Sequence, residues 1–282
     1  MRKNSIVVGE KRIEGKYSRI LAVGEVQIFD SEIKRLYLMG EANIEHSIIH
    51  KLHCMGAIEG EALAFNDFEI IGEANLHDIC TGDFFGITGN LSADFLECKI
   101  LRNGLPSKKI KMQKNFEWRG TFKAETFENF STFFLPRDYE FRNIISSDLM
   151  ICNSELVCDN FYSFGGFRGE SINAENITMV LHDEIVLQNM MGSKIHICGS
   201  FQEDKLFKSI PKSAYYKKTV FRGRLIKIAS IEGDRINIEA TRSNLVSGID
   251  VVIGDLSVID RVEYKNSIQI SEKAVVGEVI KV

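Results

Sequence analysis

The chain has 282 residues, of which 44% are hydrophobic and 26% charged, and its formal net charge is -4 at pH 7. This composition supports a continuous core, and the negative balance argues against nucleic acid as a partner, because nucleic-acid-binding surfaces carry a basic excess. No stretch reaches about 18 uncharged apolar residues and no apolar secretion segment follows Met1, so we expect a cytoplasmic protein without an integral membrane segment.

The residue types favour strands. Nineteen Phe and seven Tyr accompany plentiful Ile and Val, while Pro occurs only three times. The cysteines show no Cys-x-x-Cys spacing and several have apolar neighbours, so we expect buried, reduced thiols rather than disulfides or zinc ligands. They are Cys54, Cys80, Cys98, Cys152, Cys158 and Cys198.

A repeat of sixteen residues runs through the first part of the chain. Its marker is a glycine that opens a phrase such as Val23-Gly-Glu-Val-Gln-Ile, at Gly24, Gly40, Gly56 and Gly72. The period is too short for ankyrin or tetratricopeptide units but suits one coil of a β-solenoid, in which each coil pairs with the last. We place these glycines at a corner, where the missing Cβ permits positive φ or a close approach of coils.

Apolar residues recur at fixed places after each glycine. Equivalent positions of successive coils lie about 4.8 Å apart, so each place would form a ladder of stacked side chains. Place thirteen (Tyr37, His53 and Glu69) is largely polar and is expected outside. The places expected inside are nine (Ile33, Ile49, Phe65 and Thr81), twelve (Ile20, Leu36, Leu52, Phe68, Phe84 and Ile100), fourteen (Leu38, Cys54 and Ile70) and fifteen (Met39, Met55, Ile71 and Ile87).

The sequence predicts an all-β fold, a parallel β-helix with about sixteen residues per coil and irregular loops. We divide it into a regular solenoid at 1–104, an irregular, aromatic-rich continuation at 105–202, a basic loop or short helix at 203–224, and a C-terminal β stack at 225–282. The frame slips near Thr88-Gly89, before the first boundary.

Several common motifs are absent. The chain has no Gly-x-x-x-x-Gly-Lys-Ser/Thr loop, no Gly-x-Gly-x-x-Gly after a strand, no Gly-x-Ser-x-Gly elbow and no His-Glu-x-x-His. We therefore expect a protein that is not an enzyme, with no catalytic, cofactor-binding or metal-binding residues.

Polar clusters that suggest chemistry each have a simpler interpretation. His46, His50 and His53 would meet on a helix and bind a metal, but they diverge in a solenoid coil. A glutamate column after the corner glycines would recruit a cation if desolvated, but we expect it to be solvated. Aspartates on an outer face resemble those of glycan-cleaving β-helices, but they fall in turn-like breaks. The carboxylates are Glu25, Glu41, Glu73, Asp67, Asp78, Asp83 and Asp94.

Two basic segments carry aromatic residues that would suit an anionic partner or a membrane surface, although exposed loops are ordinarily Lys-rich. The first has Lys108, Lys109, Lys111, Lys114, Phe116 and Trp118, and the second has Lys205, Lys208, Lys212, Tyr215, Tyr216, Lys217 and Lys218.

The Gly-Glu-[Val/Ala]-x-[Ile/Leu] coils between Ile20 and Ile100, with a second echo from Leu245 to Tyr264, resemble the bactofilins, polymer-forming cytoskeletal proteins of bacteria. The resemblance implies a right-handed β-helix that assembles end to end into filaments without nucleotide and serves as a scaffold for envelope-associated enzymes. It carries over no catalytic residues.

We therefore expect a non-catalytic scaffold whose partners are other copies of itself and an envelope-associated protein. Short apolar strands near both ends, Ile6-Val-Val8 and Ala274–Ile280, favour end-to-end contacts because an uncovered strand edge pairs readily. The alternative is a solenoid that binds a protein or glycan without polymerising. The third hypothesis is an enzyme, either a carbohydrate-active β-helix or a hexapeptide-repeat acyltransferase.

Overall fold

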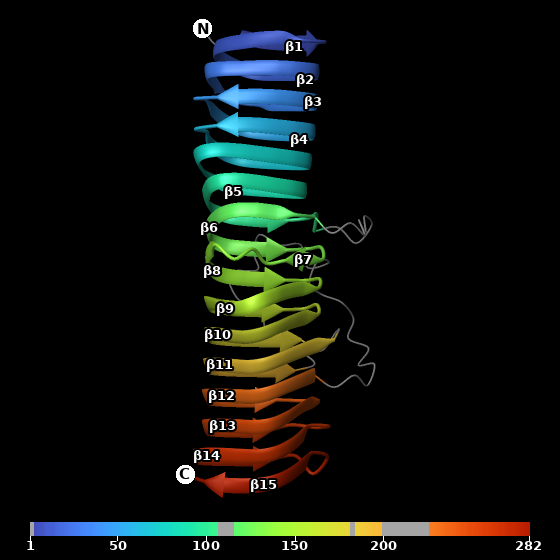
Figure 1. Ribbon diagram of the computed structural model, residues 1–282, viewed down its shortest axis with the longest axis vertical. Helices are drawn as coiled ribbons and strands as arrows, with labels where there is room; N and C mark the ends of the chain where they lie inside the picture. Colours follow the sequence, from blue (N-terminus) through green and yellow to red (C-terminus); the bar gives the residue numbers. More distant parts are fainter. Residues whose placement is uncertain (1–2, 107–115, 181–183, 199–225) are drawn as a thin grey trace. The chain divides into compact units, whose positions relative to one another are not determined.

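The computed structural model describes residues 3–106, 116–180, 184–198 and 226–282 (Figure 1). The described residues form strands, turns and connecting segments without a helix, and their strands pair in parallel. The strands are β1 (Lys3–Val8), β2 (Lys11–Ile33), β3 (Leu36–Glu45), β4 (Ile48–Glu61), β5 (Ala64–Asn103), β6 (Trp118–Asn129), β7 (Phe133–Phe134), β8 (Tyr139–Ser146), β9 (Met150–Ser163), β10 (Phe167–Val180), β11 (Ile185–Cys198), β12 (Ile226–Ile238), β13 (Thr241–Ile253), β14 (Val258–Ile270) and β15 (Val275–Lys281).

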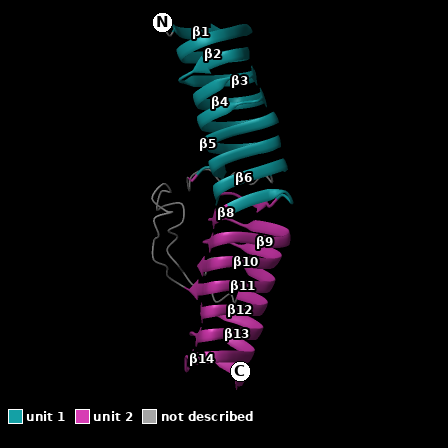
Figure 2. Ribbon diagram, turned by 90° about the vertical axis from the view of Figure 1, so that its left-hand side faces the viewer, with its two compact units in different colours: residues 1–105, 113–128, 136–141 teal, residues 106–112, 129–135, 142–282 magenta. Residues whose placement is uncertain are grey.

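The chain divides into two compact units (Figure 2). Unit 1 comprises residues 1–105, 113–128 and 136–141, and unit 2 comprises residues 106–112, 129–135 and 142–282. The segment boundaries expected at 104, 202 and 224 stay predictions. The basic segment 203–224 lies outside the described residues.

Unit 1 is a parallel β-solenoid with about 16 residues per turn, as the repeat predicts. The register pairs Ile20 with Leu36, Leu36 with Leu52, and Leu52 with Phe68, so place twelve forms a continuous ladder. All four side chains are fully buried. Because each coil pairs its backbone with the next, the apolar places of the repeat become one core.

The repeat frame gains one residue within β5. A spacing of sixteen would place Thr88 above Gly72, but Gly89 takes that position. The left-handed corners at Asp30, His46, Ala62 and Asp78 are still sixteen residues apart. The extra residue therefore falls after Asp78, before the predicted slip. Because neighbouring strand positions face opposite sides, the shift exchanges inside for outside. Phe85 and Leu101 are buried where Phe84 and Ile100 were expected, and Thr81 is exposed.

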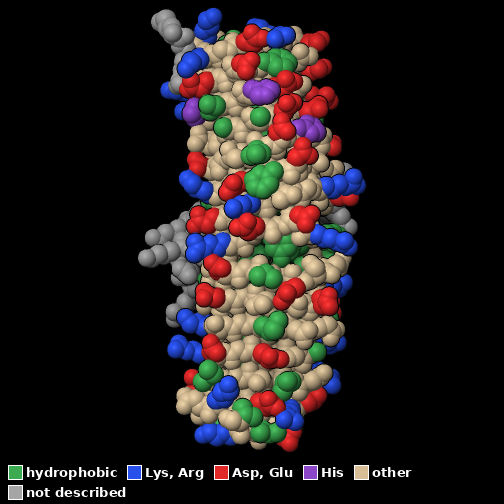
Figure 3. Space-filling view, turned by 60° about the vertical axis from the view of Figure 1, so that its left-hand side comes forward, with side chains coloured by type: hydrophobic (Ala, Val, Ile, Leu, Met, Phe, Trp, Pro, Cys, Tyr) green, Lys and Arg blue, Asp and Glu red, His purple; other side chains and the backbone are tan. Residues whose placement is uncertain are grey.

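Place fifteen does not line the core as predicted. Met39 is 58% exposed and Met55 57%, while Ile71 is also exposed. The reason is strand alternation: Leu38 points inward, so the next residue must point outward. Val23, Met39, Met55 and Ile71 pair in register and make an exposed apolar ladder. Apolar side chains also lie among charged ones on the face in Figure 3. Ile87 is buried, because the extra residue in β5 moves it to the inner side.

The glycine corner is tightly packed. Gly40, Gly56 and Gly72 have φ between 137° and 144°, a region that side chains other than glycine rarely adopt. A Cβ built on Gly56 would lie 1.9 Å from the carbonyl oxygen of Gly40. Both predicted reasons for glycine, positive φ and close approach of coils, are therefore confirmed.

In unit 2 the strands β9 to β14 pair in parallel, each with the next along the chain. The ladder that runs through its core consists of Phe161, Ile177, Ile195, Ile236 and Val251, all buried. Large aromatic side chains, including Phe164 and Phe167, are buried near its beginning.

Gly56→Ala should destabilise the protein by about 4 kcal/mol or more, because the new Cβ overlaps the backbone of the coil before it. Gly15→Ala is the matched control: Gly15 also has positive φ, 100°, but nothing lies within 4 Å of its Cβ position. We expect about 1–2 kcal/mol for this variant, from left-handed strain alone. Urea unfolding measures both, and equal losses would contradict the stacking constraint.

Candidate functional site

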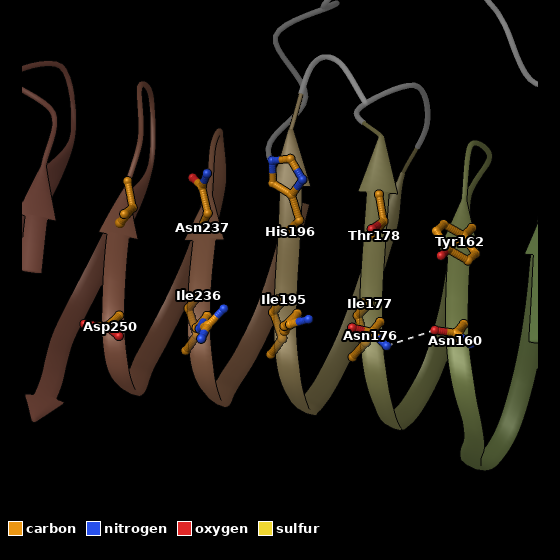
Figure 4. A pocket seen from close by; sticks show the side chains of 13 residues that line it. Asn160, Tyr162, Asn176, Ile177, Thr178, Ile195, His196, Ile236, Asn237 and Asp250 are labelled. Atoms are coloured by element: carbon orange, nitrogen blue, oxygen red, sulfur yellow. Dashed lines mark hydrogen bonds between the residues drawn. The ribbon is translucent and has the colours of Figure 1, made fainter. Parts of the chain in front are cut away.

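An open groove of about 770 Å³ lies on the outer face of β9 to β13 in unit 2 (Figure 4). Two ladders line it, with the buried core ladder between them. The first, which we call the charged ladder, consists of Asn160, Asn176, Lys194, Arg235 and Asp250. The second, the mixed ladder, consists of Tyr162, Thr178, His196, Asn237 and Val252.

The sequence positions these side chains through simple alternation. Each strand contributes an outward residue, a buried residue and a second outward residue, as in Lys194-Ile-His196 and Arg235-Ile-Asn237. The buried residue packs into the core and so fixes the outward pair on either side of it. Parallel register then places the pairs of five strands in two rows.

Asparagines at one end of the charged ladder hydrogen-bond in series. Asn176 Nδ2 donates to Asn160 Oδ1 at 2.9 Å, and Asn160 Nδ2 donates to Asn143 Oδ1 at 2.7 Å. Each amide carries both a donor and an acceptor, so identical side chains can satisfy one another up the ladder. The series holds these amides in a fixed orientation at the groove.

Lys194 and Arg235 follow in the same ladder as directly paired, exposed residues. Within the part of the chain that the structure describes, neither forms an ion pair. The two positive charges stand at about one strand spacing and repel each other, and the Asp250 carboxylate follows on the Arg235 side of the ladder.

Asp250 continues the ladder beside Arg235. Hydrogen bonds from Ser267 and Asn266, at 2.6 and 2.7 Å, hold the pKa of the Asp250 carboxyl below its ordinary value, and Arg235 lowers it further. Asp250 is thus a carboxylate that accepts hydrogen bonds and does not donate them. It is the one carboxylate among the described residues lining the groove.

The three neighbouring histidines point to separate partners. His46 lies at a left-handed corner near Glu61, His50 Nδ1 lies 2.7 Å from Asn66 Oδ1, and His53 stacks on Tyr37. Among the described residues, no cluster of His, Cys, Asp or Glu has the geometry to hold a metal.

The predicted carboxylates of unit 1 are found at the surface. Glu25, Glu41 and Glu73 are exposed and stand in one column interrupted by Ala57. Asp67 and Asp83 accept from lysines of neighbouring coils, at 2.8 Å from Lys51 and 2.6 Å from Lys99. Asp78 and Asp94 lie close together, because the backbone N–H of Asp78 donates a hydrogen bond to the Asp94 carboxylate.

The aromatic residues of the first basic segment do not form a surface. Phe116 is 8% exposed and Trp118 6%, and Trp118 Nε1 donates to the carbonyl of Gly89. They pack into unit 1 because large aromatic rings are stabilised by burial. The remaining residues of both basic clusters, Lys108, Lys109, Lys111, Lys114, Lys205, Lys208, Lys212, Tyr215, Tyr216, Lys217 and Lys218, lie outside the described residues.

The six cysteines all lie among the described residues and are not linked by disulfides, and all except Cys158 are buried. Burial raises the pKa of Cys54, Cys98 and Cys158 to about 12. A cysteine and a histidine do approach in the groove region, where His196 Nδ1 lies 3.8 Å from Cys198 Sγ. Cys198 is only 4% exposed, so a substrate has no access to its sulfur.

No motif in the sequence marks the groove. The strands of the groove share a three-residue pattern in which an apolar residue stands between two polar ones. It occurs in Asn176-Ile-Thr178, Lys194-Ile-His196 and Arg235-Ile-Asn237. The intervals between these segments are unequal, so a fixed repeat does not align them. Aligning the segments by their central apolar residue is the signal that would have found the two ladders.

Comparisons of the chain with protein-family models, curated proteins and solved structures found no match. Across the described residues, no helix has the length and apolar character required to cross a membrane.

Asn160→Leu should lower the free energy of unfolding by about 1–3 kcal/mol, because it removes two side-chain hydrogen bonds. Asn173→Leu, at an exposed position of β10, is the control and should change it little. Urea unfolding compares them, and equal effects would show that the asparagine series contributes no stability.

Cys54 and Cys98 should resist alkylation by iodoacetamide at about pH 8, because their pKa of about 12 keeps both thiols protonated and the fold covers them. Both should react after unfolding in urea. Peptide mass spectrometry identifies the modified sites, and rapid labelling in the native protein would contradict this burial.

Proposed function

We propose that this protein is a non-catalytic, bactofilin-like scaffold of the cytoplasm, whose copies associate end to end through the solenoid termini without nucleotide. The observation that carries the proposal is the uncovered coil at β15. Among the strands that the structure describes, β15 pairs with β14 alone, so its other edge presents backbone donors and acceptors to which no described strand pairs.

The side chains of that coil support the same proposal. Val279 pairs with Val262, which is completely buried, yet Val279 is 45% exposed because no further coil covers it. Val275 is 65% exposed. A second copy that continued the parallel pairing would bury this apolar surface and satisfy the free edge at the same time.

Within the described ranges, β1 pairs with β2 alone and so offers the complementary edge. Both β1 and β15 are edge strands of a parallel sheet. The β15 edge of one copy could pair in parallel with the β1 edge of another through the same hydrogen-bond pattern that joins strands within the units. No nucleotide is required for such pairing. An envelope-associated protein partner follows from the resemblance to bactofilins and is part of the proposal.

A binding role without polymerisation is the second candidate, and the groove of unit 2 favours it. Hydrolysis of a glycan ordinarily requires two carboxyl groups flanking the bond, whereas the described lining of the groove has Asp250 alone. The groove therefore suits binding better than hydrolysis.

Val279→Lys should raise the dissociation constant for self-association by tenfold or more, because it places a charge on apolar surface that a second copy would cover. Val157→Lys is the control, since Val157 is 55% exposed on the side of β9. Negative-stain microscopy and sedimentation, across salt and protein concentration, should show filaments for the wild type and the control but not for Val279→Lys. A wild-type protein that stays monomeric at high concentration, or equal assembly of both variants, would overturn the proposal.

A further inference from the structure

We propose that the groove of unit 2 binds an acidic polysaccharide. Lys194 and Arg235 contact its carboxylate groups, while the asparagines and Asp250 contact its hydroxyl groups. This site is separate from the solenoid ends and does not depend on self-assembly.

The charge of the ladder points to an anionic ligand. Lys194 and Arg235 project from directly paired positions of β11 and β12, and their like charges repel in the free protein. An anion bound between them relieves this repulsion. A carboxylate fits well because a guanidinium presents two parallel donors that match its two oxygens, and the ammonium supplies a further donor.

The Asp250 carboxylate requires a ligand that also carries hydroxyl donors. Asp250 is held ionised by Ser267, Asn266 and Arg235, so it can only accept hydrogen bonds. The phosphodiester backbone of DNA offers acceptors and negative charge, but it has no hydroxyl donor for Asp250. A sugar acid carries carboxylates for the cations and hydroxyl donors for Asp250, and the amides of Asn176 and Asn237 can serve either.

Two other classes of polymer fit poorly. A peptide that binds a sheet by strand addition needs a free edge, but β9 to β13 each have neighbours on both sides. Single-stranded nucleic acid binds through exposed aromatic rings on which bases stack. Among the described lining residues, Tyr162 is the one Phe, Tyr or Trp and is only 8% exposed, so the smaller His196 imidazole is the one partly exposed ring.

The size and repetition of the groove match an extended chain. Its volume of about 770 Å³ lies within the range of about 300–1,000 Å³ usual for ligand sites. The two rows cross five successive strands at near-constant spacing (Figure 4), so a polymer with repeating units meets a repeating set of polar groups.

The test uses isothermal titration calorimetry of the full chain with an oligosaccharide of uronic acid. The matched ligand is the same oligosaccharide with its carboxyl groups reduced to alcohols. The double variant Lys194→Gln and Arg235→Gln removes the paired cations. Its control is Lys227→Gln with Arg242→Gln, which removes an equally stacked, exposed pair outside the groove lining. Thermal unfolding verifies that each variant is folded.

We expect the wild type and the control pair to bind the acidic oligosaccharide with similar affinity, and the groove variant to bind it at least tenfold more weakly. The reduced oligosaccharide should bind weakly to all three proteins, and added salt should weaken acidic binding. No binding by the wild type, equal losses in the two double variants, equal affinity for the neutral oligosaccharide, or tighter binding of single-stranded DNA would each overturn the proposal.

Discussion

Backbone pairing between successive coils is the constraint on which the structure depends. Each strand of a solenoid must match the one before it, so equivalent positions repeat one above another and each position acquires a single environment along a unit. Inside unit 1 this produces the fully buried ladder of Ile20, Leu36, Leu52 and Phe68. At the corner it brings the backbones of Gly40 and Gly56 so close that no side chain fits between them. Core and corner are consequences of one geometry.

The same constraint organises the surface. Outward residues of consecutive coils form ladders whose chemistry depends on what the sequence places at that position. In unit 1 this gives the exposed apolar ladder that includes Met39 and Met55, and ion pairs between coils such as Lys51 with Asp67. In unit 2 it gives the asparagine series, followed by Lys194 and Arg235. A solenoid can thus present an extended row of polar groups without a loop-built pocket.

Two surfaces carry the functional proposals, and they act through different groups. Assembly depends on the unpaired edges of the terminal strands and on apolar side chains such as Val279, which a further coil would cover. Polysaccharide binding depends on outward side chains of β9 to β13, whose backbone groups are already paired with neighbouring strands. End-to-end pairing would use the backbone edges of β1 and β15, and the proposed polysaccharide contacts use neither edge. The two proposals are therefore physically compatible.

The sequence alone determined the β-solenoid, its repeat of about sixteen residues and the glycine corner, because these depend on residue types recurring at one interval. It misplaced Met39, Phe84 and Thr81, because periodicity identifies a column but does not say which face the column takes or where an extra residue shifts it. The groove was decided by tertiary structure. Its strands contribute Asn176, Lys194 and Arg235 at unequal intervals, and only the pairing of their backbones brings these side chains into one row.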